Sequence, residues 1–320
     1  MVRILCCCCV SLAVYIAAFA FVLDRPLTIG ALRSRIEASV RLGHTLHRPK
    51  LIILAGSNGP YSHRCETIGP IIDRPCINAG AAVGVGLDYL FTRWKPLLRR
   101  GDIVYLPLEE AQYVRPRATA FLGPDAAIML RHDRTTLWTL SRRRQIAAVF
   151  ASGPRDAIMS MIEAALSEDG FHDPRSAATG GTNVWGDHFG HTAALAALNL
   201  STLQAIAPYH PTGGQISLGY GTMLVGDFIR WAGDQGVLVV GGLPTGFADS
   251  PISDASLAAI RAIYRENGAG FLELANHSRY PRAAFFDTQD HLNEGAQIGH
   301  SMLVAEALIA FTDQTPEPSP

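Results

Sequence analysis

Five short apolar runs, separated by segments of helical periodicity, set the pattern of this chain. A run of this length without polar alternation is typical of a strand buried on both faces, and strands that alternate with helices form a parallel sheet. The expected strands cover residues 51–55, 76–77, 103–106, 236–240 and 270–274. The sequence therefore predicts an α/β three-layer sandwich. Its strand ends meet at one edge of the sheet, where open α/β folds bind ligands.

The 320-residue chain predicts one large domain over residues 51–312, long enough to bury a substantial core. Between residues 114 and 219 the alternation breaks, and we expect a mainly helical insertion that caps the strand ends. Residues 313–320 are expected to be a disordered tail. The formal net charge of −1 gives no electrostatic reason to expect nucleic acid as a partner. No phosphate loop or dinucleotide fingerprint is present, and no cofactor is expected.

The N-terminal segment is strongly apolar. From residue 4 to residue 23 only Ser11 is clearly polar, which is long enough to cross a hydrocarbon core, so residues 1–23 predict a transmembrane anchor or an export signal. Residues 24–50 predict a basic amphipathic stem, because apolar residues recur at helical spacing among arginines. This helix lies on the bilayer, packs under the domain, or is an ordinary surface helix.

Two cysteines, Cys65 and Cys76, lie outside the apolar N-terminal segment. If the domain is exported, they can close a disulfide loop. Because Cys76 opens a predicted buried strand, a free thiol in the core is the favoured prediction. The other four cysteines, residues 6–9, lie within the apolar run and do not fit a metal site.

Ser57 follows the first expected strand, and an aspartate–histidine pair stands near the end of the domain. A serine hydroxyl is a weak nucleophile until a histidine takes its proton, and that histidine needs a carboxylate to fix its tautomer. The chain offers Ser57, Asp287 and His291 in that order. Asp290 is the alternative acid, but neighbouring side chains in an extended loop project to opposite sides, whereas Asp287 can fold back onto His291 across a turn.

Three blocks together resemble the SGNH, or GDSL-type, hydrolase superfamily: Ala55-Gly-Ser57-Asn, Asn78-Ala-Gly80 and Asp287-x-x-x-His291. The chain looks most like its membrane-tethered bacterial branch, which accompanies cell-surface polysaccharide acylation. The resemblance spans roughly residues 50–312 and implies a flavodoxin-like sheet. It also implies Ser57 as nucleophile, the amides of Ser57 and Gly80 as oxyanion hole, and His291 with Asp287 as base and acid.

Two features depart from that family. No aspartate precedes Ser57, and the third block, Gly-x-Asn-Asp, is replaced at the third strand end by a segment containing Glu109 and Gln112. In the family the missing asparagine donates to the oxyanion, and loss of such a donor typically costs about 2.7–4 kcal/mol. Gln112 is one possible substitute, whereas an ionised Glu109 raises the energy of an adjacent oxyanion. Alternatively, both residues only satisfy polar groups at the sheet edge.

The segment around residues 183–191 supplies further polar side chains. Its Asp-His-x-x-His lacks the helical histidine pair of a zinc protease, and no metal is expected. Loops rich in Gly, Asn and His beside a site more readily contact substrate. The candidate substrate-binding residues are Asn58, Asn78, Glu109, Gln112, Asn183, Asp187 and His188.

These inferences predict a serine esterase or O-acyltransferase that acts on O-acyl groups of an envelope or secreted polysaccharide. Water as the second acceptor gives an esterase, and a sugar hydroxyl gives a transferase. The expected partners are an acylated polysaccharide or small ester, the membrane, and a polysaccharide synthase or membrane acyltransferase. The alternative is a non-catalytic accessory or glycan-binding protein of a polysaccharide synthesis complex.

Two signals disagree on which side of the membrane the body lies. The arginines after Leu23 would hold it in the cytoplasm by the positive-inside rule. The family resemblance points to the periplasm, which is the favoured prediction.

Overall fold

A five-stranded parallel sheet lies at the centre of the chain, which a computed structural model describes over residues 2–23, 28–151 and 181–314. The strand order is β2-β1-β3-β6-β8, and every neighbouring pair is parallel. The predicted α/β class is confirmed. The strands are β1 (Leu51–Ile53), β2 (Cys76–Asn78), β3 (Ile103–Leu106), β6 (Leu238–Gly242) and β8 (Gly270–Leu272).

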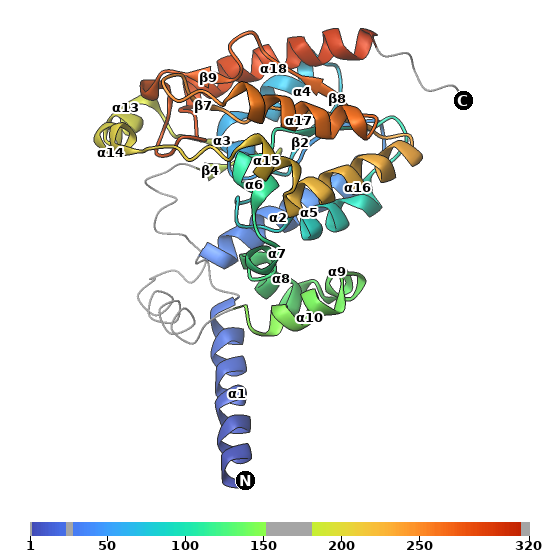
Figure 1. The fold of residues 1–320 in the computed structure, drawn as a ribbon, viewed down its shortest axis with the longest axis vertical. Helices are drawn as coiled ribbons and strands as arrows, with labels where there is room; N and C mark the ends of the chain where they lie inside the picture. The colour runs from blue at the N-terminus through green and yellow to red at the C-terminus, as the bar shows by residue number, and fades with distance from the viewer. Residues whose placement is uncertain (1, 24–27, 152–180, 315–320) are drawn as a thin grey trace.

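Helices cover both faces of the sheet. Successive strand residues point to opposite sides, and because nearly all of them are apolar, both faces have to be buried. Ile52 and Val104 belong to the larger core cluster, whereas Leu51 and Ile103 belong to the smaller one. Figure 1 shows the two helical layers on either side of the strands. The larger cluster joins the sheet to α2 (Thr28–Thr45), α5 (Leu87–Trp94), α16 (Tyr220–Asp234) and α17 (Asp254–Glu266). The smaller cluster joins it to α4 (Cys65–Ile71) and α18 (Glu294–Gln314).

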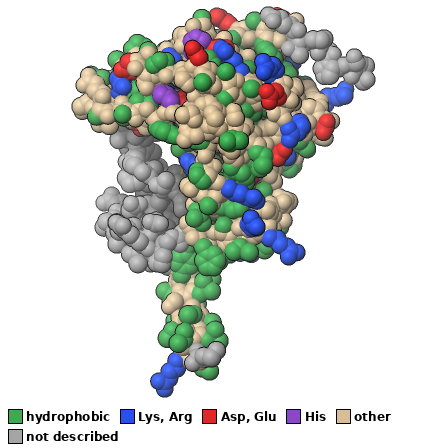
Figure 2. Space-filling view, viewed as in Figure 1, with side chains coloured by type: hydrophobic (Ala, Val, Ile, Leu, Met, Phe, Trp, Pro, Cys, Tyr) green, Lys and Arg blue, Asp and Glu red, His purple; other side chains and the backbone are tan. Residues whose placement is uncertain are grey.

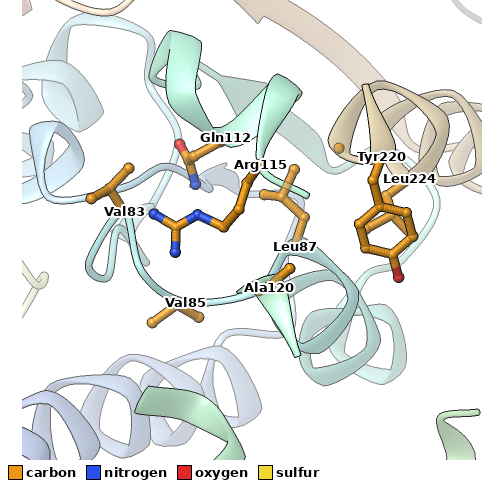
Figure 3. Close-up of a pocket in the computed structure, with 10 residues that line it drawn as sticks. Val83, Val85, Leu87, Gln112, Arg115, Ala120, Tyr220 and Leu224 are labelled. Carbon is orange, nitrogen blue, oxygen red and sulfur yellow. The ribbon is translucent and has the colours of Figure 1, made fainter. Parts of the chain in front are cut away.

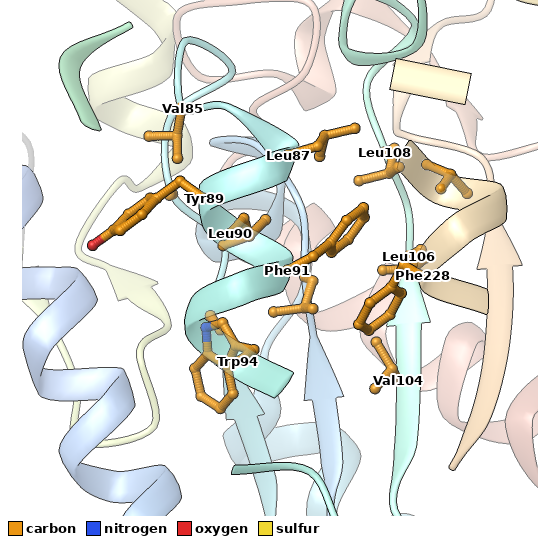
Figure 4. Packing of buried hydrophobic residues seen from close by; sticks show 14 of the residues in the cluster. Val85, Leu87, Tyr89, Leu90, Phe91, Trp94, Val104, Leu106, Leu108 and Phe228 are labelled. Atoms are coloured by element: carbon orange, nitrogen blue, oxygen red, sulfur yellow. The ribbon is translucent and has the colours of Figure 1, made fainter. Parts of the chain in front are cut away.

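The contact between α5 and α16 shows how the larger layer closes. Leu87 and Phe91 of α5 point toward β3 and α16 (Figure 4), and the rings of Phe91 and Phe228 stack 4.3 Å apart with a 10° interplanar angle. Offset aromatic pairs of this kind add stability beyond the area that they bury.

Helix α2 is an integral part of the domain. Leu32, Ile36 and Val40 lie one turn apart and are all buried in the larger core cluster. Ser39, on the same side, donates a hydrogen bond to the carbonyl of Asn78 at the end of β2. Of the roles predicted for this segment, the structure therefore supports packing against the domain.

Helix α1 (Val2–Leu23) projects from the body and contacts α8 (Pro124–His132). Figure 2 shows mainly hydrophobic side chains on its surface, and Val2, Ile4 and Leu5 are strongly exposed. Even so, no helix in the described ranges combines the length and apolarity needed to cross a bilayer. The predicted membrane-anchored, periplasmic location is corrected accordingly, because the anchor that it requires is not found there.

The segment between β3 and β6 is mainly helical where it is described, as predicted. It holds α6 (Glu110–Val114), α7 (Arg117–Ala120), α8, α9 (Arg134–Thr139), α10 (Arg142–Val149), a hairpin of β4 (Gly181–Thr182) and β5 (His188–Phe189), α13 (Ala193–Ala197), α14 (Leu200–Ala205) and α15 (Gly213–Ser217). Helices α8 and α9 pack against α2 and α5, so they extend one helical layer, whereas β5 contacts α3 (Asn58–Ser62) at the end of β1. Among the described parts of the insertion, β5 thus reaches the end of β1, and α8 reaches the loop after β2, where Asp125 accepts the Gly86 amide. Residues 152–180 of the predicted insertion lie outside the described residues.

Cys65 and Cys76 form a disulfide between α4 and β2, with their Cα atoms 5.1 Å apart. The prediction of a free thiol is therefore wrong. The two residues meet because α4 packs directly against β2, which brings both Cα atoms into the range that a disulfide spans.

Candidate active site

Ser57 lies where β1 turns into α3, at the carboxyl edge of the sheet. It is half-buried and precedes the first residue of the helix. The turn is tight: a Cβ at Gly80 would lie 2.8 Å from the Cα of Gly59 and 2.5 Å from Cδ of Pro60. Glycine at 80 is therefore required for the segment after β2 to approach α3. Within the described residues, the Ser57 hydroxyl forms no hydrogen bond and so remains available.

His291 and Asp287 form the predicted hydrogen-bonded pair. Nδ1 of His291 lies 2.7 Å from Oδ1 of Asp287. The His291 side chain is 12% exposed, while the Asp287 side chain is 39% exposed. A carboxylate at Nδ1 holds the proton on that nitrogen and leaves Nε2 as the basic atom. The geometry therefore selects Asp287 over Asp290 as the partner of His291.

Helix α3 links this pair to Ser57. The Tyr61 ring stacks on the His291 ring at 4.1 Å and 12°, and the Tyr61 amide donates to the Ser57 carbonyl. Ser62 accepts the Leu292 amide at 3.3 Å and donates to the Asp290 carbonyl at 2.8 Å. His291 thus lies beside the first turn of the helix that Ser57 begins. No hydrogen bond joins the two residues in the described structure, and such bonds are often long before substrate binds.

The predicted oxyanion hole is not open. The Asn58 amide donates to Oε1 of Glu109 at 3.2 Å, and the Ser57 amide bonds the same carboxyl group. The Gly80 amide donates to Oδ1 of Asn78 at 3.3 Å. Both donors therefore have internal acceptors, as expected for amides in a buried turn. Glu109 can approach so closely because Gly56 has no side chain in its path.

Burial, together with repulsion from the Asp290 carboxyl, raises the pKa of Glu109 to about 8, against the opposing effect of the two amides and Arg115. Burial likewise raises the pKa of Asp290 to about 6, against the opposing effect of His291 and Arg279. Glu109 is thus mainly uncharged at pH 7. A neutral carboxylic acid next to Ser57 does not repel a developing oxyanion and can donate a hydrogen bond.

Most of the predicted substrate-binding residues instead hold the fold together. Asn58 donates to the Pro107 carbonyl at 2.7 Å, and Asn78 donates to the Gly59 and His63 carbonyls and to Asp187. Both side chains are fully buried. They join the turn after β1 to the ends of β2 and β3, which excludes direct contact with a substrate in this conformation.

Of the three residues predicted from the 183–191 segment, two also hold the fold together and one contacts Tyr61. Asp187 accepts the amides of Cys65 and Glu66 at the start of α4, and Asn183 accepts the Asp187 amide. These two are structural. His188, in contrast, stacks on Tyr61, whose ring also stacks on His291; the ring centroids of His188 and Tyr61 lie 4.2 Å apart.

Gln112 completes the helix start beside Glu109. Its Oε1 accepts the Glu109 amide at 3.0 Å, so it acts as a local cap, as the alternative prediction had it. It also lines a small pocket together with Arg115 of the same segment, valines of the loop after β2, and Tyr220 and Leu224 of α16 (Figure 3). The cavity volume is about 10 Å³, room for roughly one water molecule.

Sequence reasoning missed Tyr61 and Ser62. Both lie in α3, and their spacing from Ser57 puts them on the first turns of the helix, but only the fold shows that the 287–292 loop packs there. Within the described ranges, no cluster of histidine, cysteine and acidic side chains could hold a metal ion.

Comparison with protein-family models finds no match for this chain, and comparison with curated proteins finds none either.

Proposed function

We propose that this protein is a serine ester hydrolase with Ser57 as nucleophile, His291 as base and Asp287 as the acid that orients it. The observation that carries the proposal is the 2.7 Å hydrogen bond from His291 to Asp287, on a loop held against the helix that Ser57 begins. The sheet order supports it, because numbering the five strands along the chain gives 2-1-3-4-5, the flavodoxin-like order. The resemblance to SGNH hydrolases supports the same assignment.

In this mechanism Oγ of Ser57 attacks the ester carbonyl while Nε2 of His291 takes its proton and passes it to the leaving alcohol. Asp287 stabilises the imidazolium that forms. Water then attacks the acyl-enzyme by the same route, or a sugar hydroxyl does so in a transferase. The resemblance names O-acyl groups of a polysaccharide as the substrate.

Glu109 takes the place of the missing asparagine in this mechanism. It follows β3, the strand whose end carries that asparagine in the family, and its carboxyl group bonds the Ser57 amide. We propose that neutral Glu109 donates its O–H to the oxyanion. Because it already holds the Ser57 turn, it needs no large movement to do so.

The direct test is hydrolysis of p-nitrophenyl acetate by the purified protein and its Ser57→Ala variant. The expected loss is at least about a thousandfold, the scale for removal of a triad member. Ser201→Ala, an exposed serine of α14, is the matched control and should retain full activity. Equal rates for the wild-type protein and Ser57→Ala would overturn the proposal.

A second candidate function, non-catalytic glycan binding, is favoured by one observation: the amides of Ser57 and Gly80 already have acceptors. A protein of this kind binds an acetylated oligosaccharide without turning it over. Titration calorimetry with that ligand would then give the same affinity for the wild-type protein and Ser57→Ala, together with no release of acetate.

A further inference from the structure

A second serine–histidine–carboxylate array lies next to the first site. Nδ1 of His210 lies 3.0 Å from both carboxylate oxygens of Glu110, and Nε2 of His210 lies 3.0 Å from Oγ of Ser250. The three residues come from the start of α6, the loop before α15 and the turn after β7 (Gly246–Phe247). They are about 100 and 40 residues apart in the chain, so no sequence motif brings them together.

The hydrogen bonds fix the tautomer of His210. A carboxylate only accepts, so Nδ1 carries the proton and Nε2 holds a lone pair. The Ser250 hydroxyl then donates to Nε2, which is the arrangement that activates a serine nucleophile. Glu110 and His210 are largely buried, with side chains 10% and 22% exposed.

Arg279 of β9 (Arg279–Tyr280) lines the same small cavity as the three residues. Its side chain is only 8% exposed. Nη1 donates to the Pro244 carbonyl, and Nη2 lies 3.7 Å from Glu110. Among the described residues, Nε and Nη2 have no hydrogen-bond acceptor. Buried N–H groups without an acceptor are costly, so these donors suit an oxygen that a ligand brings.

The cavity sets the size of the group that can reach these donors of Arg279. Its volume is about 10 Å³, and Thr245, Gln289 and Asp290 complete its lining. It therefore has room for about one oxygen atom, such as the carbonyl oxygen of an ester that reaches the half-buried Ser250 from solvent. Asp290 belongs to the loop that carries His291, so the two sites share a wall.

We propose that Ser250 is a second nucleophile, with His210 as its base, Glu110 as the residue that positions His210, and Arg279 as the donor to the oxyanion. The substrate class is a carboxylic ester whose carbonyl oxygen enters the cavity. The bond from Ser250 Oγ to the acyl carbon forms as the bond to the alcohol oxygen breaks, and the serine proton passes through Nε2 of His210 to the alcohol. Water then releases the acid by the reverse proton path. This activity goes beyond the proposed function of Ser57 and does not depend on it.

The test is covalent labelling with diisopropyl fluorophosphate, followed by trypsin and fragment mass spectrometry of the full-length protein. Cleavage after Lys50, Arg64, Arg230 and Arg261 puts Ser57 and Ser250 on separate peptides, 51–64 and 231–261. We expect Ser250 to be labelled in the wild-type protein and equally in Ser57→Ala. If only the proposed Ser57 site is inactive, peptide 51–64 stays unlabelled while peptide 231–261 is still labelled.

Two variants separate catalysis from a structural role of these contacts. His210→Gln should slow labelling of Ser250 by at least about a hundredfold, the range of general-base assistance, and leave the rate at Ser57 unchanged. Glu110→Gln, which keeps size and hydrogen bonding, should slow Ser250 in the same selective way. Circular dichroism checks that each variant is folded. Absence of label on Ser250 in the folded wild-type protein, or an unchanged rate in His210→Gln, would overturn the proposal.

Discussion

At the scale of single residues, the hydrogen bond between Asp287 and His291 predicts which of two nearby aspartates, Asp287 or Asp290, is needed for turnover. Asp287→Asn should lower the turnover of p-nitrophenyl acetate on the order of a thousandfold, because an amide at Nδ1 stabilises the wrong tautomer of His291. Asp290→Asn is the matched control. Its carbonyl, not its side chain, holds Ser62, so its turnover should change far less. If Asp290→Asn, and not Asp287→Asn, causes the large loss of turnover, Asp290 is the acid that orients His291.

Glu109 gives the reaction a characteristic dependence on pH. Ionisation of this carboxyl, whose pKa is raised to about 8 by burial, places a negative charge against the Ser57 turn. Ester turnover should therefore fall as the pH rises through about 8. Glu109→Gln keeps a neutral donor of the same size, so the fall should disappear while activity at pH 7 persists. A pH profile of kcat in which wild type and variant coincide would contradict this role.

The same carboxyl couples stability to pH. In the unfolded chain Glu109 has its ordinary pKa of 4.5, and in the folded chain the pKa is about 8, so between these values the folded state holds the extra proton. The stability that this proton provides is lost as pH rises through that window, by up to about 1.4 kcal/mol per pH unit. Denaturant titrations at several pH values should show that the free energy of unfolding falls more steeply with pH for the wild-type protein than for Glu109→Gln.

Residues that are close in sequence could be predicted, and residues that are close only in space could not. Asp287 and His291 lie four residues apart, so a single turn suffices to bring them together. The acceptors of the Ser57 and Asn58 amides belong to Glu109, about 50 residues away, and its approach depends on the parallel pairing of β1 with β3. A sequence shows that such amides need acceptors, but not which ones they find.

At the scale of helices and strands, the contact between α3 and the segment after β2 fixes the geometry of the Ser57 turn. Gly80→Ala should reduce the free energy of unfolding by about 1–3 kcal/mol, the usual cost of overpacking, because its Cβ meets Gly59 and Pro60. Gly233→Ala in α16, where a Cβ meets nothing within 4 Å, should be neutral or stabilising by about 0.5–1 kcal/mol. Similar denaturation midpoints for the two variants would show that the turn can relax.

The elements themselves were largely accessible from the sequence, because strand runs and helix periodicity are local. β3 has the predicted bounds, while β6 begins two residues later than its apolar run. The disulfide was missed because the thiol of Cys76 looks like any buried strand residue until α4 is packed beside it. Pairings between elements, unlike the elements, depend on the tertiary arrangement.

At the scale of the whole molecule, α2 determines where the domain begins. The sequence left open whether this basic helix lies on the bilayer, packs under the domain as a stem or is an ordinary surface helix, since amphipathic spacing is common to all three. Ile36 is 6% exposed within the larger core cluster, and Ser34 is exposed on the same helix.

Ile36→Ala should therefore destabilise the domain by about 2–5 kcal/mol, the cost of a large-to-small change in a packed core, and Ser34→Ala should leave it within about 0.5 kcal/mol of wild type. Denaturant unfolding followed by circular dichroism measures both. Because α2 also bonds the end of β2 through Ser39, the loss should appear in one cooperative transition of the whole domain. If Ile36→Ala unfolds at the wild-type midpoint, α2 is a detachable stem and the folded domain begins at β1.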